Sequence, residues 1–452
     1  MSEKPEREGK RGGHSSARRT KYALIAGMAI LVLAVAAVVF LALNGKSGVP
    51  DVAWGKVQAA SSESMTAEPS TAAPQTEPAE PTETAEPTET SEPSTTEAPE
   101  PTSSVEEEKA QALLAGMTLE EKVYQLFIVT PRALTGFYGA DIAGPTTQEA
   151  LQNYPVGGII YFSENIYNEG QISDMIRLSQ EYARYPLFIG VDEEGGRVSR
   201  LSSIGVTDIL DPMATYGAQG DTARVREIGQ TLGAQLGSVG FNIDFAPVAD
   251  VVTNPNNTEI GDRSFSSDPQ VAADMVAAMV EGLQSSGTIS CLKHFPGHGS
   301  TEADTHEGLS VTSRTLEELR QTELLPFRAG IDAGVEMVMI SHMSAPAITG
   351  DNTPCDLSPA IVTDLLREEL GFTGVIVTDS HEMGAITNYY GCGEAAVKAI
   401  AAGCDIVLMP NNLEEAAGAV LTALENGELT EARINESVLR ILTLKYRCGI
   451  IE

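Results

Sequence analysis

The sequence is poor in cysteine and in basic residues, and each shortage excludes a class of protein. Five cysteines in 452 residues are too few for a disulfide scaffold, and no two form the C-x-x-C spacing of a structural zinc site. Only 29 Lys and Arg residues stand against 63 Asp and Glu, which gives a net charge of −34. Nucleic-acid binding needs clustered basic side chains, so we expect no nucleic acid among the partners.

Part of the acidic excess is concentrated in one segment. Residues 51–108 contain fourteen Asp and Glu and a single Lys, and residues 60–104 are mostly Glu, Pro, Thr, Ser and Ala. Such a composition buries too little apolar surface to offset the entropy lost on ordering. We therefore predict a disordered stalk at residues 44–107 and a folded domain at residues 108–452.

A long uncharged run precedes this stalk. Residues 22–43 carry no charge, and a helix of this length spans about 33 Å, close to the hydrocarbon thickness of a bilayer. Residues 1–21 are basic, so the positive-inside rule places them in the cytoplasm and the rest of the chain outside. A cleaved signal peptide is the alternative, but its apolar region is usually shorter, about 7–15 residues, and the Asn-Gly-Lys-Ser-Gly that follows Leu43 is not a convincing cleavage site. We expect single-pass attachment to the lipid bilayer of the cell membrane, with an extracellular domain.

Short apolar runs recur in the remaining sequence. Eight have the length of strands: Phe127–Thr130, Val156–Phe162, Leu187–Asp192, Phe241–Asp250, Thr288–His294, Val335–His342, Val375–Asp379 and Asp405–Met409. Helical periodicity lies between most of them, for example at Ile172–Tyr185, Thr222–Val239, Pro269–Ser286, Leu316–Ala333 and Pro359–Leu370. This alternation predicts a (β/α)8 barrel of the TIM type. An open doubly wound sheet is the alternative, but no G-x-G-x-x-G follows a strand.

Several of these runs end in polar or charged residues. They are Asp192, Asp250, Lys293-His294, Ser341-His342 and Asp379. In a barrel, the carboxyl ends of the strands meet on one face, where active sites are built. We therefore expect the active site at this face.

Three of the six histidines lie between residues 294 and 306. His294 and His298 have the spacing of metal ligands on a helix, but Pro296 and Gly297 between them argue against a helix. The sequence contains no H-x-H or H-E-x-x-H motif. We expect no catalytic metal and no cofactor.

Two pairs of polar residues are candidates for chemistry. Asp304 and His306 point the same way in an extended loop, and a neighbouring carboxylate makes an imidazole a proton donor near neutral pH. Beside such a donor, Asp379 becomes a candidate nucleophile, although a helix cap also suits its position. Asp192 and Arg200 are candidates to clamp the hydroxyls of a ligand, with a surface salt bridge as the alternative.

Six motifs occur in a fixed order: D-E-E-G-G-R-V-S-R at 192–200, N-I-D-F-A-P-V-A-D at 242–250, D-R-S-F at 262–265, K-H-F-P-G-H-G at 293–299, D-T-H at 304–306 and T-D at 378–379. Together they resemble glycoside hydrolase family 3, in particular its β-N-acetylhexosaminidase branch, over residues 108–450. The motif pair that points to this branch in particular is K-H-F-P-G-H-G followed by D-x-H. The sequence departs from the family pattern at Ser300 and Ser310, where Asp and Pro are usual. Many relatives continue into a second domain, which we do not expect here.

The resemblance implies a role for each candidate. Asp379 is the expected nucleophile, His306 the acid/base and Asp304 its partner. The groups expected to bind the hydroxyls and acetamido region of an N-acetylglucosamine (GlcNAc) ring are Asp192, Arg200, Arg263, Lys293 and His294.

The implied activity is that of a retaining exo-β-N-acetylglucosaminidase acting on GlcNAc-containing glycans or cell-wall muropeptides. Three alternatives remain open: a phosphorylase that uses phosphate as the acceptor on the same fold, a non-catalytic glycan-binding barrel, and a metal-dependent amidohydrolase.

Overall fold

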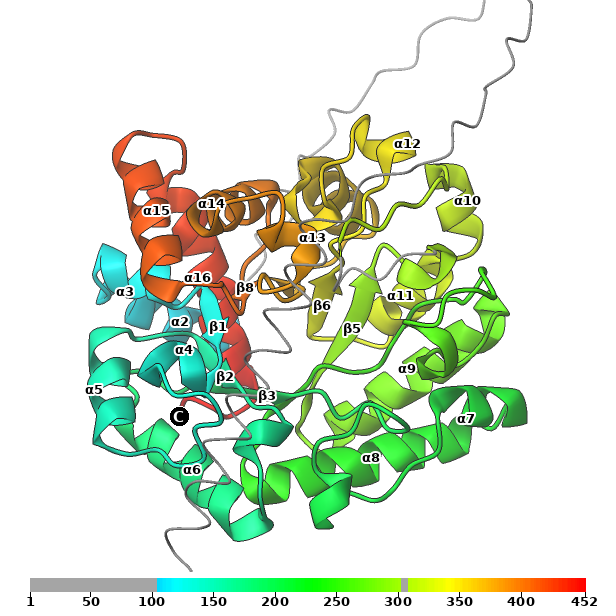
Figure 1. Ribbon diagram of the computed structural model, residues 1–452, viewed down its shortest axis with the longest axis horizontal. Helices are drawn as coiled ribbons and strands as arrows, with labels where there is room; N and C mark the ends of the chain where they lie inside the picture. Colours follow the sequence, from blue (N-terminus) through cyan, green and yellow to red (C-terminus); the bar gives the residue numbers. More distant parts are fainter. Residues whose placement is uncertain (1–103, 302–307) are drawn as a thin grey trace, which may run out of the picture. The chain divides into compact units, whose positions relative to one another are not determined.

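The computed structural model describes residues 104–301 and 308–452 (Figure 1). The basic tail, the apolar run at 22–43 and nearly all of the predicted stalk lie outside the described residues. Helix α2 begins at Val105, three residues before the predicted start of the folded domain, and the Ser104 hydroxyl caps it by accepting a hydrogen bond from the Glu107 N–H at 3.2 Å. Within the described ranges, no helix combines the length and hydropathy needed to cross a bilayer.

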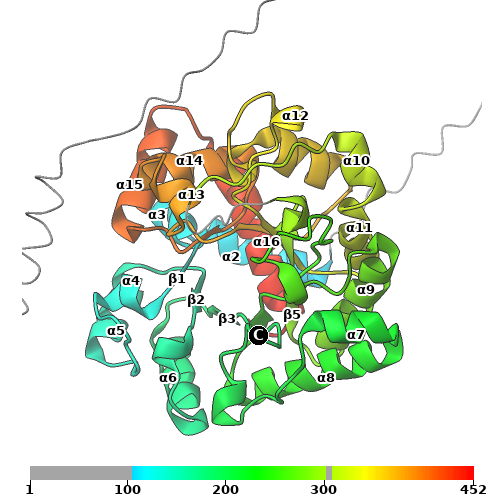
Figure 2. The same ribbon diagram turned by 45° about the vertical axis from the view of Figure 1, so that its right-hand side comes forward.

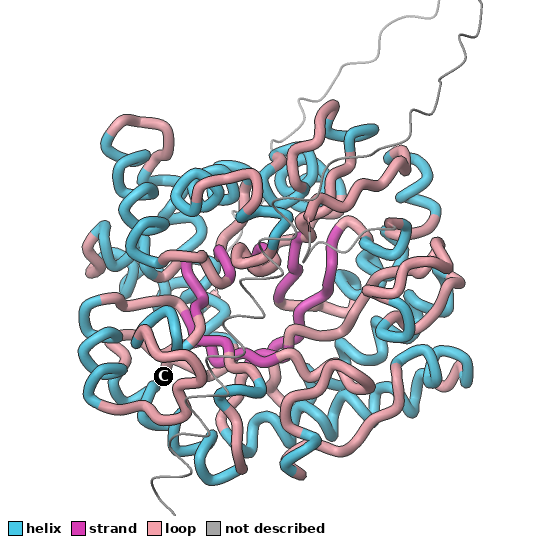
Figure 3. Tube along the Cα trace, viewed as in Figure 1, coloured by secondary structure: helices cyan, strands magenta, loops and turns pink. Residues whose placement is uncertain are grey.

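Eight parallel strands form the centre of the domain. They are β1 (Phe127–Val129), β2 (Gly158–Ile160), β3 (Phe188–Val191), β4 (Ile243–Asp244), β5 (Ile289–Phe295), β6 (Met337–Ile340), β7 (Val375–Thr378) and β8 (Val407–Leu408). Each strand pairs with the next in the chain from β1 to β7, and β8 pairs with β1. The circle closes where the Thr378 N–H donates to the Ile406 carbonyl at 3.0 Å. The strands surround a common centre with the helices outside (Figure 3), and the predicted (β/α)8 barrel is confirmed.

Helices follow the strands around the barrel. The α-helices are α2 (Val105–Ala115), α3 (Leu119–Tyr124), α4 (Pro131–Thr135), α5 (Pro145–Asn153), α6 (Glu169–Tyr182), α7 (Met213–Gln219), α8 (Thr222–Val239), α9 (Pro269–Ser285), α10 (Leu316–Gln321), α11 (Leu324–Asp332), α12 (Pro346–Thr349), α13 (Gly384–Thr387), α14 (Cys392–Ala402), α15 (Leu413–Glu425) and α16 (Glu431–Arg447). The other helical segments are η1 (Ser163–Asn165), η2 (Ser202–Ile204), η3 (Gly261–Arg263), η4 (His298–Ser300), η5 (Cys355–Leu357) and the π-helix η6 (Ala360–Glu369). The C-terminal helix α16 lies beside α2 in both ribbon views (Figure 2).

One predicted helix is two helices in the structure. The periodic segment Leu316–Ala333 is interrupted between α10 and α11 at Thr322, whose φ and ψ are −131° and −83°. Pro326 lies four residues further on, and a proline ring clashes with the carbonyl of the residue four positions earlier. The proline therefore accounts for the break, which a reading of apolar periodicity alone missed.

A lysine is buried at the end of the barrel opposite the carboxyl ends of the strands. Lys445, on α16, is fully buried, and its ammonium donates to Gln125 Oε1 at 3.0 Å, just before β1. The ammonium also lies 4.9 Å from the centre of the Phe188 ring, at the start of β3. Burial lowers the pKa of Lys445 to about 7, so the folded domain holds this amine partly uncharged at neutral pH.

Candidate active site

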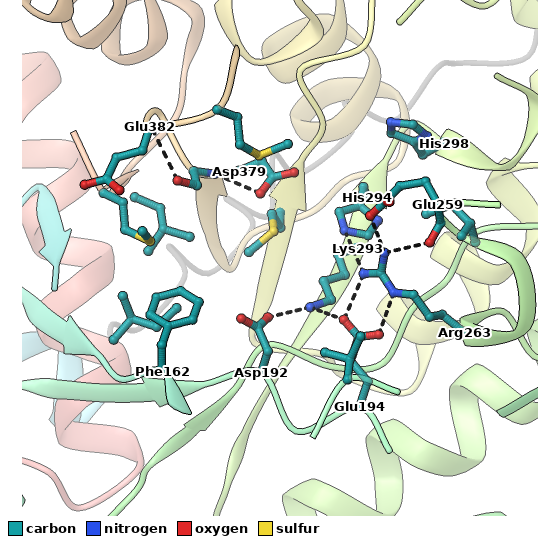
Figure 4. Close-up of a pocket in the computed structure, with 18 of the residues that line it drawn as sticks. Phe162, Asp192, Glu194, Glu259, Arg263, Lys293, His294, His298, Asp379 and Glu382 are labelled. Atoms are coloured by element: carbon teal, nitrogen blue, oxygen red, sulfur yellow. Dashed lines mark hydrogen bonds and ion pairs between the residues drawn. The ribbon is translucent and has the colours of Figure 1, made fainter. Parts of the chain in front are cut away.

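A cavity of about 440 Å³ lies at the carboxyl ends of the strands (Figure 4). Its charged and polar lining comes from the ends of several strands and the loops after them: Asp192, Glu194, Arg200, Glu259, Arg263, Lys293, His294, His298, Asp379, Ser380 and Glu382. All predicted site residues except Asp304 and His306 therefore meet in one cavity. Those two lie outside the described residues, so their predicted pairing stays a prediction.

Asp379 directly follows β7 and faces this cavity. Its backbone N–H donates to the Ile340 carbonyl at 2.9 Å, which joins it to β6. Its Oδ1 accepts a hydrogen bond from the Ser380 N–H at 2.8 Å. Burial raises the pKa of Asp379, but nearby positive charge on His342 and His294, this N–H and Lys293 outweigh burial and leave the pKa below its usual value. The carboxylate is therefore ionised near neutral pH, as a nucleophile must be.

A network of opposite charges lines the wall of the cavity that β3 and β5 provide. The Lys293 ammonium lies 2.6 Å from both Asp192 Oδ1 and Glu194 Oε1. Arg263 binds Glu194 through two parallel hydrogen bonds of 2.8 and 2.9 Å. Burial raises the pKa of Glu194, but the two cations outweigh burial and lower it. The network presents fixed donors and acceptors to a polar ligand.

Glu193 holds the loop that carries this network. Its buried carboxylate accepts the Arg200 N–H at 2.6 Å and the Thr207 hydroxyl at 2.7 Å, while its own N–H donates to Asp244 Oδ1 at 3.0 Å. Burial raises the pKa of Asp244 well above its usual value, which favours a protonated carboxyl there. Glu193 thereby ties the start of the loop to β4 and to the loop residues Arg200 and Thr207.

Arg200 and Asp192 both line the cavity, as predicted, but they have different partners. Asp192 forms an ion pair with Lys293, whereas the Arg200 guanidinium lies 5.7 Å from the centre of the Phe162 ring. A clamp in which the two act together on one ligand stays a prediction. Phe162, at the end of the β2 run, gives the cavity an aromatic wall that the sequence analysis did not single out.

Asp250 orients the two histidines of the K-H-F-P-G-H-G segment. Its Oδ2 lies 2.7 Å from His294 Nδ1, and its Oδ1 accepts the His298 N–H at 2.6 Å. Burial lowers the pKa of His298. The sequence indicates only that Asp250 is a polar strand end, because its partners His294 and His298 lie more than 40 residues further along the chain.

A buried cluster of two histidines and one aspartate lies behind Asp379. His342 Nε2 lies 2.8 Å from the Ser380 carbonyl, and its Nδ1 lies 3.1 Å from Asp356 Oδ1. His381 Nε2 lies 3.0 Å from Asp356 Oδ2. Burial lowers the pKa of His342, but Asp356 outweighs burial and raises it to about 9. The result is a buried ion pair whose positive end contacts the backbone next to the nucleophile candidate.

The same cluster is the group in the described part of the chain whose geometry could hold a metal ion. The ligand atoms of His342, Asp356 and His381 lie within 4.8 Å of one another. Imidazole and carboxylate are ordinary zinc ligands. In the sequence only His294 and His298 have the spacing of metal ligands, whereas His342, Asp356 and His381 are too far apart along the chain to indicate a shared site.

Comparison with known proteins identifies the family. The sequence model of a protein family, described as the glycosyl hydrolase family 3 N-terminal domain, matches residues 118–444 of the chain. The chain belongs to this family. The family predicted from the sequence motifs is therefore confirmed.

Relatives in this family are somewhat more than one third identical to the chain over the residues that match. Beta-hexosaminidase A of Pseudoalteromonas piscicida is 36% identical over 331 residues, which are 67% of this chain and 55% of that protein. Beta-hexosaminidase LpqI of Mycobacterium tuberculosis is 38% identical over 312 residues, which are 66% of this chain and 78% of that protein.

A solved structure shows the same fold. The glycoside hydrolase family 3 β-N-acetylglucosaminidase from Paenibacillus sp. has a TM-score of 0.70 and 38% identity, and the match covers 74% of this chain and 63% of that one. The chain thus spans just over half of the Pseudoalteromonas protein and under two thirds of the Paenibacillus one. Its own activity is therefore a proposal.

Proposed function

We propose that the chain is a retaining exo-β-N-acetylglucosaminidase that removes terminal β-linked GlcNAc from cell-wall fragments or other glycans. The observation that carries the proposal is the ionised Asp379 in the same cavity as the charged network of Lys293, Asp192 and Glu194. An anion that attacks a sugar and a set of fixed polar groups that hold its hydroxyls are the two parts such a reaction needs. The names of the relatives from Pseudoalteromonas, Mycobacterium and Paenibacillus agree with this activity.

The reaction proceeds in two displacements. The Asp379 carboxylate attacks the anomeric carbon, the glycosidic C–O bond breaks, and the leaving oxygen takes a proton from His306. Water then attacks the same carbon and gives its proton back to His306, which frees Asp379 and releases the sugar with its β configuration retained. Asp304 orients His306 and supports its charged form. The roles of His306 and Asp304 rest on the sequence motif.

The place of the enzyme in the cell is part of the same proposal. Residues 22–43 anchor the chain in the cell membrane, the acidic segment at 44–107 holds the domain away from it, and the domain is extracellular. The length and lack of charge of the apolar run support the anchor, and the basic residues before it support the orientation.

Asp379→Asn tests the proposed nucleophile. The substitution keeps the size of the side chain but removes the anion, so we expect kcat on a chromogenic β-GlcNAc glycoside to fall by at least about 10³-fold. Asp364→Asn is the matched control, because Asp364 is an exposed carboxylate on η6, and it should keep full activity. The product of the unmodified enzyme, observed by NMR, should first appear as the β-anomer.

Other outcomes would identify a different function. Activity that requires phosphate and yields a sugar phosphate would indicate a phosphorylase. Loss of activity in chelator with recovery on adding zinc would indicate metal-dependent hydrolysis. Binding of GlcNAc oligosaccharides without turnover would indicate a glycan-binding barrel. Asp379→Asn with near-normal kcat would remove Asp379 from the nucleophile role.

A further inference from the structure

The buried cluster behind Asp379 has no direct part in the reaction described above. His342 lies two residues after β6, Asp356 belongs to η5 and His381 lies three residues after β7. All three are at most 2% exposed, and none of them lines the catalytic cavity. Burying imidazole and carboxylate groups costs free energy unless hydrogen bonds or a metal ion satisfy their polar atoms. The partners of these atoms therefore indicate what the cluster does.

One ring nitrogen of His342 has a clear partner. Its Nε2 lies 2.8 Å from the carbonyl oxygen of Ser380. A carbonyl oxygen can only accept, so Nε2 carries a hydrogen and donates it. In the neutral ring the other nitrogen, Nδ1, then carries a lone pair. Histidines that bind metal ions commonly donate one ring N–H to a carbonyl in this way while the other nitrogen faces the metal.

The atoms that face each other across the gap between His342 and Asp356 lack a hydrogen bond. His342 Nδ1 and Asp356 Oδ1 are buried and lie 3.1 Å apart, yet within the described part of the chain neither has a hydrogen-bond partner. Two lone pairs at this separation repel each other unless a cation lies between them. A proton on Nδ1 is one such cation, but the two atoms are not aligned for a hydrogen bond. A metal ion that binds both atoms satisfies them together.

The distances in the cluster fit a zinc ion. Zinc binds imidazole nitrogen and carboxylate oxygen at about 2.0–2.2 Å, so two ligand atoms of a tetrahedral site lie about 3.4 Å apart. The observed separations are 3.1 Å from His342 Nδ1 to Asp356 Oδ1 and 3.0 Å from His381 Nε2 to Asp356 Oδ2. The ligand atoms of all three residues lie within 4.8 Å of one another. Small side-chain movements therefore suffice to bring the three around one ion.

The backbone holds these ligands in place. The His381 N–H donates to the carbonyl of Leu408 in β8 at 3.0 Å. Next to Asp356, the Cys355 N–H donates to the Met343 carbonyl at 2.9 Å. Ligands that the fold already positions lose little entropy when an ion binds.

A small cavity lies beside His381. Its volume is about 40 Å³, and its polar lining includes His381, Tyr390, Cys392 and Asn411. One water molecule needs only about 10–15 Å³ of such space. Where a protein supplies three ligands, water commonly takes the fourth position on zinc. The cavity therefore has room for that water next to one of the three ligands.

We propose that His342, Asp356 and His381 bind one zinc ion. The ion joins the ends of β6 and β7 to η5 and thereby stabilises the segment 379–381, which carries the nucleophile candidate. Its role is structural, because none of its three ligands lines the catalytic cavity. When zinc is absent, a proton on His342 takes the place of the ion and the domain is less stable.

The test measures zinc binding and stability on the full chain in detergent, stripped of metal with a chelator and then dialysed. After loading with zinc, metal analysis should find one zinc ion per chain. Titration against a chromophoric chelator should give a Kd below about 1 µM. Saturating zinc should raise the Tm by about 5 °C. Well below the Tm, chelation should leave kcat on the chromogenic β-GlcNAc glycoside within about twofold.

Substitutions distinguish this site from the catalytic cavity. His381→Gln and Asp356→Asn each remove one ligand, so the Kd for zinc should rise at least about 100-fold and the shift of the Tm should disappear. His298→Gln is the matched control, because it replaces a buried histidine that lines the catalytic cavity, and it should keep both the Kd and the shift. His381→Gln decides alone if Asp356→Asn does not fold.

Three results would overturn the proposal. The first is a Kd above about 1 µM, or a Kd that His381→Gln leaves unchanged. The second is zinc binding that His298→Gln abolishes and His381→Gln retains, which would place the ion in the catalytic cavity. The third is a chelator that abolishes kcat without lowering the Tm, which would make the metal catalytic. A chain that binds zinc as expected but hydrolyses no glycoside would contradict the proposed function alone, because zinc binding is measured without substrate.

Discussion

The ionisation of the nucleophile candidate depends on a histidine whose partners the sequence does not reveal. His342 ends the strand before Asp379 and contacts the carbonyl of Ser380. Its raised pKa, about 9, comes from Asp356, a residue of the short helix η5. The positive charge favours the ionised form of Asp379. The state of one carboxylate at the end of β7 is therefore set by residues from two other segments.

Replacing His342 tests this dependence through the pH profile. His342→Gln keeps a side-chain N–H for the Ser380 carbonyl but removes the charge, so the pKa of Asp379 should rise. Activity is lost as pH falls through the pKa of the nucleophile, so the acid limb of kcat/KM should move to higher pH, by about one unit.

The matched control is His381→Gln. Burial lowers the pKa of His381, so this substitution removes an imidazole that is uncharged near neutral pH, and the acid limb should stay in place. Equal shifts in both variants would mean that packing, and not the charge of His342, governs the nucleophile.

At the scale of elements, helix α7 supports the loop that carries Arg263. A Cβ added at Gly217 of α7 would lie 1.8 Å from the Phe265 carbonyl oxygen, so Gly217→Ala must displace that loop. We expect a loss of about 1–3 kcal/mol in the free energy of unfolding and a raised KM. Urea unfolding and steady-state kinetics measure the two effects.

Gly237 provides the control for that substitution. It lies in α8, is exposed, and a Cβ there would meet nothing within 4 Å. Gly237→Ala should leave KM unchanged and stabilise the domain by about 0.5–1 kcal/mol, because alanine favours helix. Similar behaviour of the two variants would show that the contact between α7 and Phe265 does not matter.

The strands were predictable from sequence because each lies in a short apolar run, and most of these runs end in a polar residue. All eight predicted runs contain the observed strands or overlap them, and the segment at 222–239 matches α8 at both ends. The site was predictable where its residues are neighbours in a single motif at a strand end, as Lys293 and His294 are. It was not predictable where function arises from residues of separate loops, as with Asp356 and His381, because spacing along the chain says nothing about contact across the barrel.

At the scale of the whole domain, Lys445 makes stability depend on pH. Its pKa of about 7 in the folded domain lies below the ordinary value near 10.4, so between these values the unfolded chain binds a proton that the folded chain does not. Stability from this group therefore rises with pH across that window and is lower below pH 7. Lys445→Met should raise the Tm more at pH 6 than at pH 9.

The exposed Lys398 provides the control for this measurement. Its partner Glu394 is also on the surface of α14, so Lys398→Met should shift the Tm by a similar small amount at both values. A Lys445→Met shift that does not vary with pH would mean that the amine stays charged in the folded domain.

Residues 1–103 should be dispensable for catalysis. The described domain contains the whole of the observed cavity and retains the Ser104 cap of α2. Without these residues we expect a soluble domain whose kcat/KM stays within about tenfold of the full chain, measured on the chromogenic glycoside. A larger loss, or aggregation of the shortened chain, would show that the N-terminal part belongs to the folded enzyme.

The pairing of the last strand with the first has a consequence for how the chain is made. Phe127 pairs with Val407, so nearly the whole domain must be synthesised before the circle of strands can close. Until then β1 and β7 are open edges, which invite pairing with other chains, and closure over such a long separation is slow. A nascent chain that pauses before residue 405 therefore exposes an incomplete sheet with two unpaired edge strands. We expect such a chain to aggregate unless chaperones bind the exposed strands.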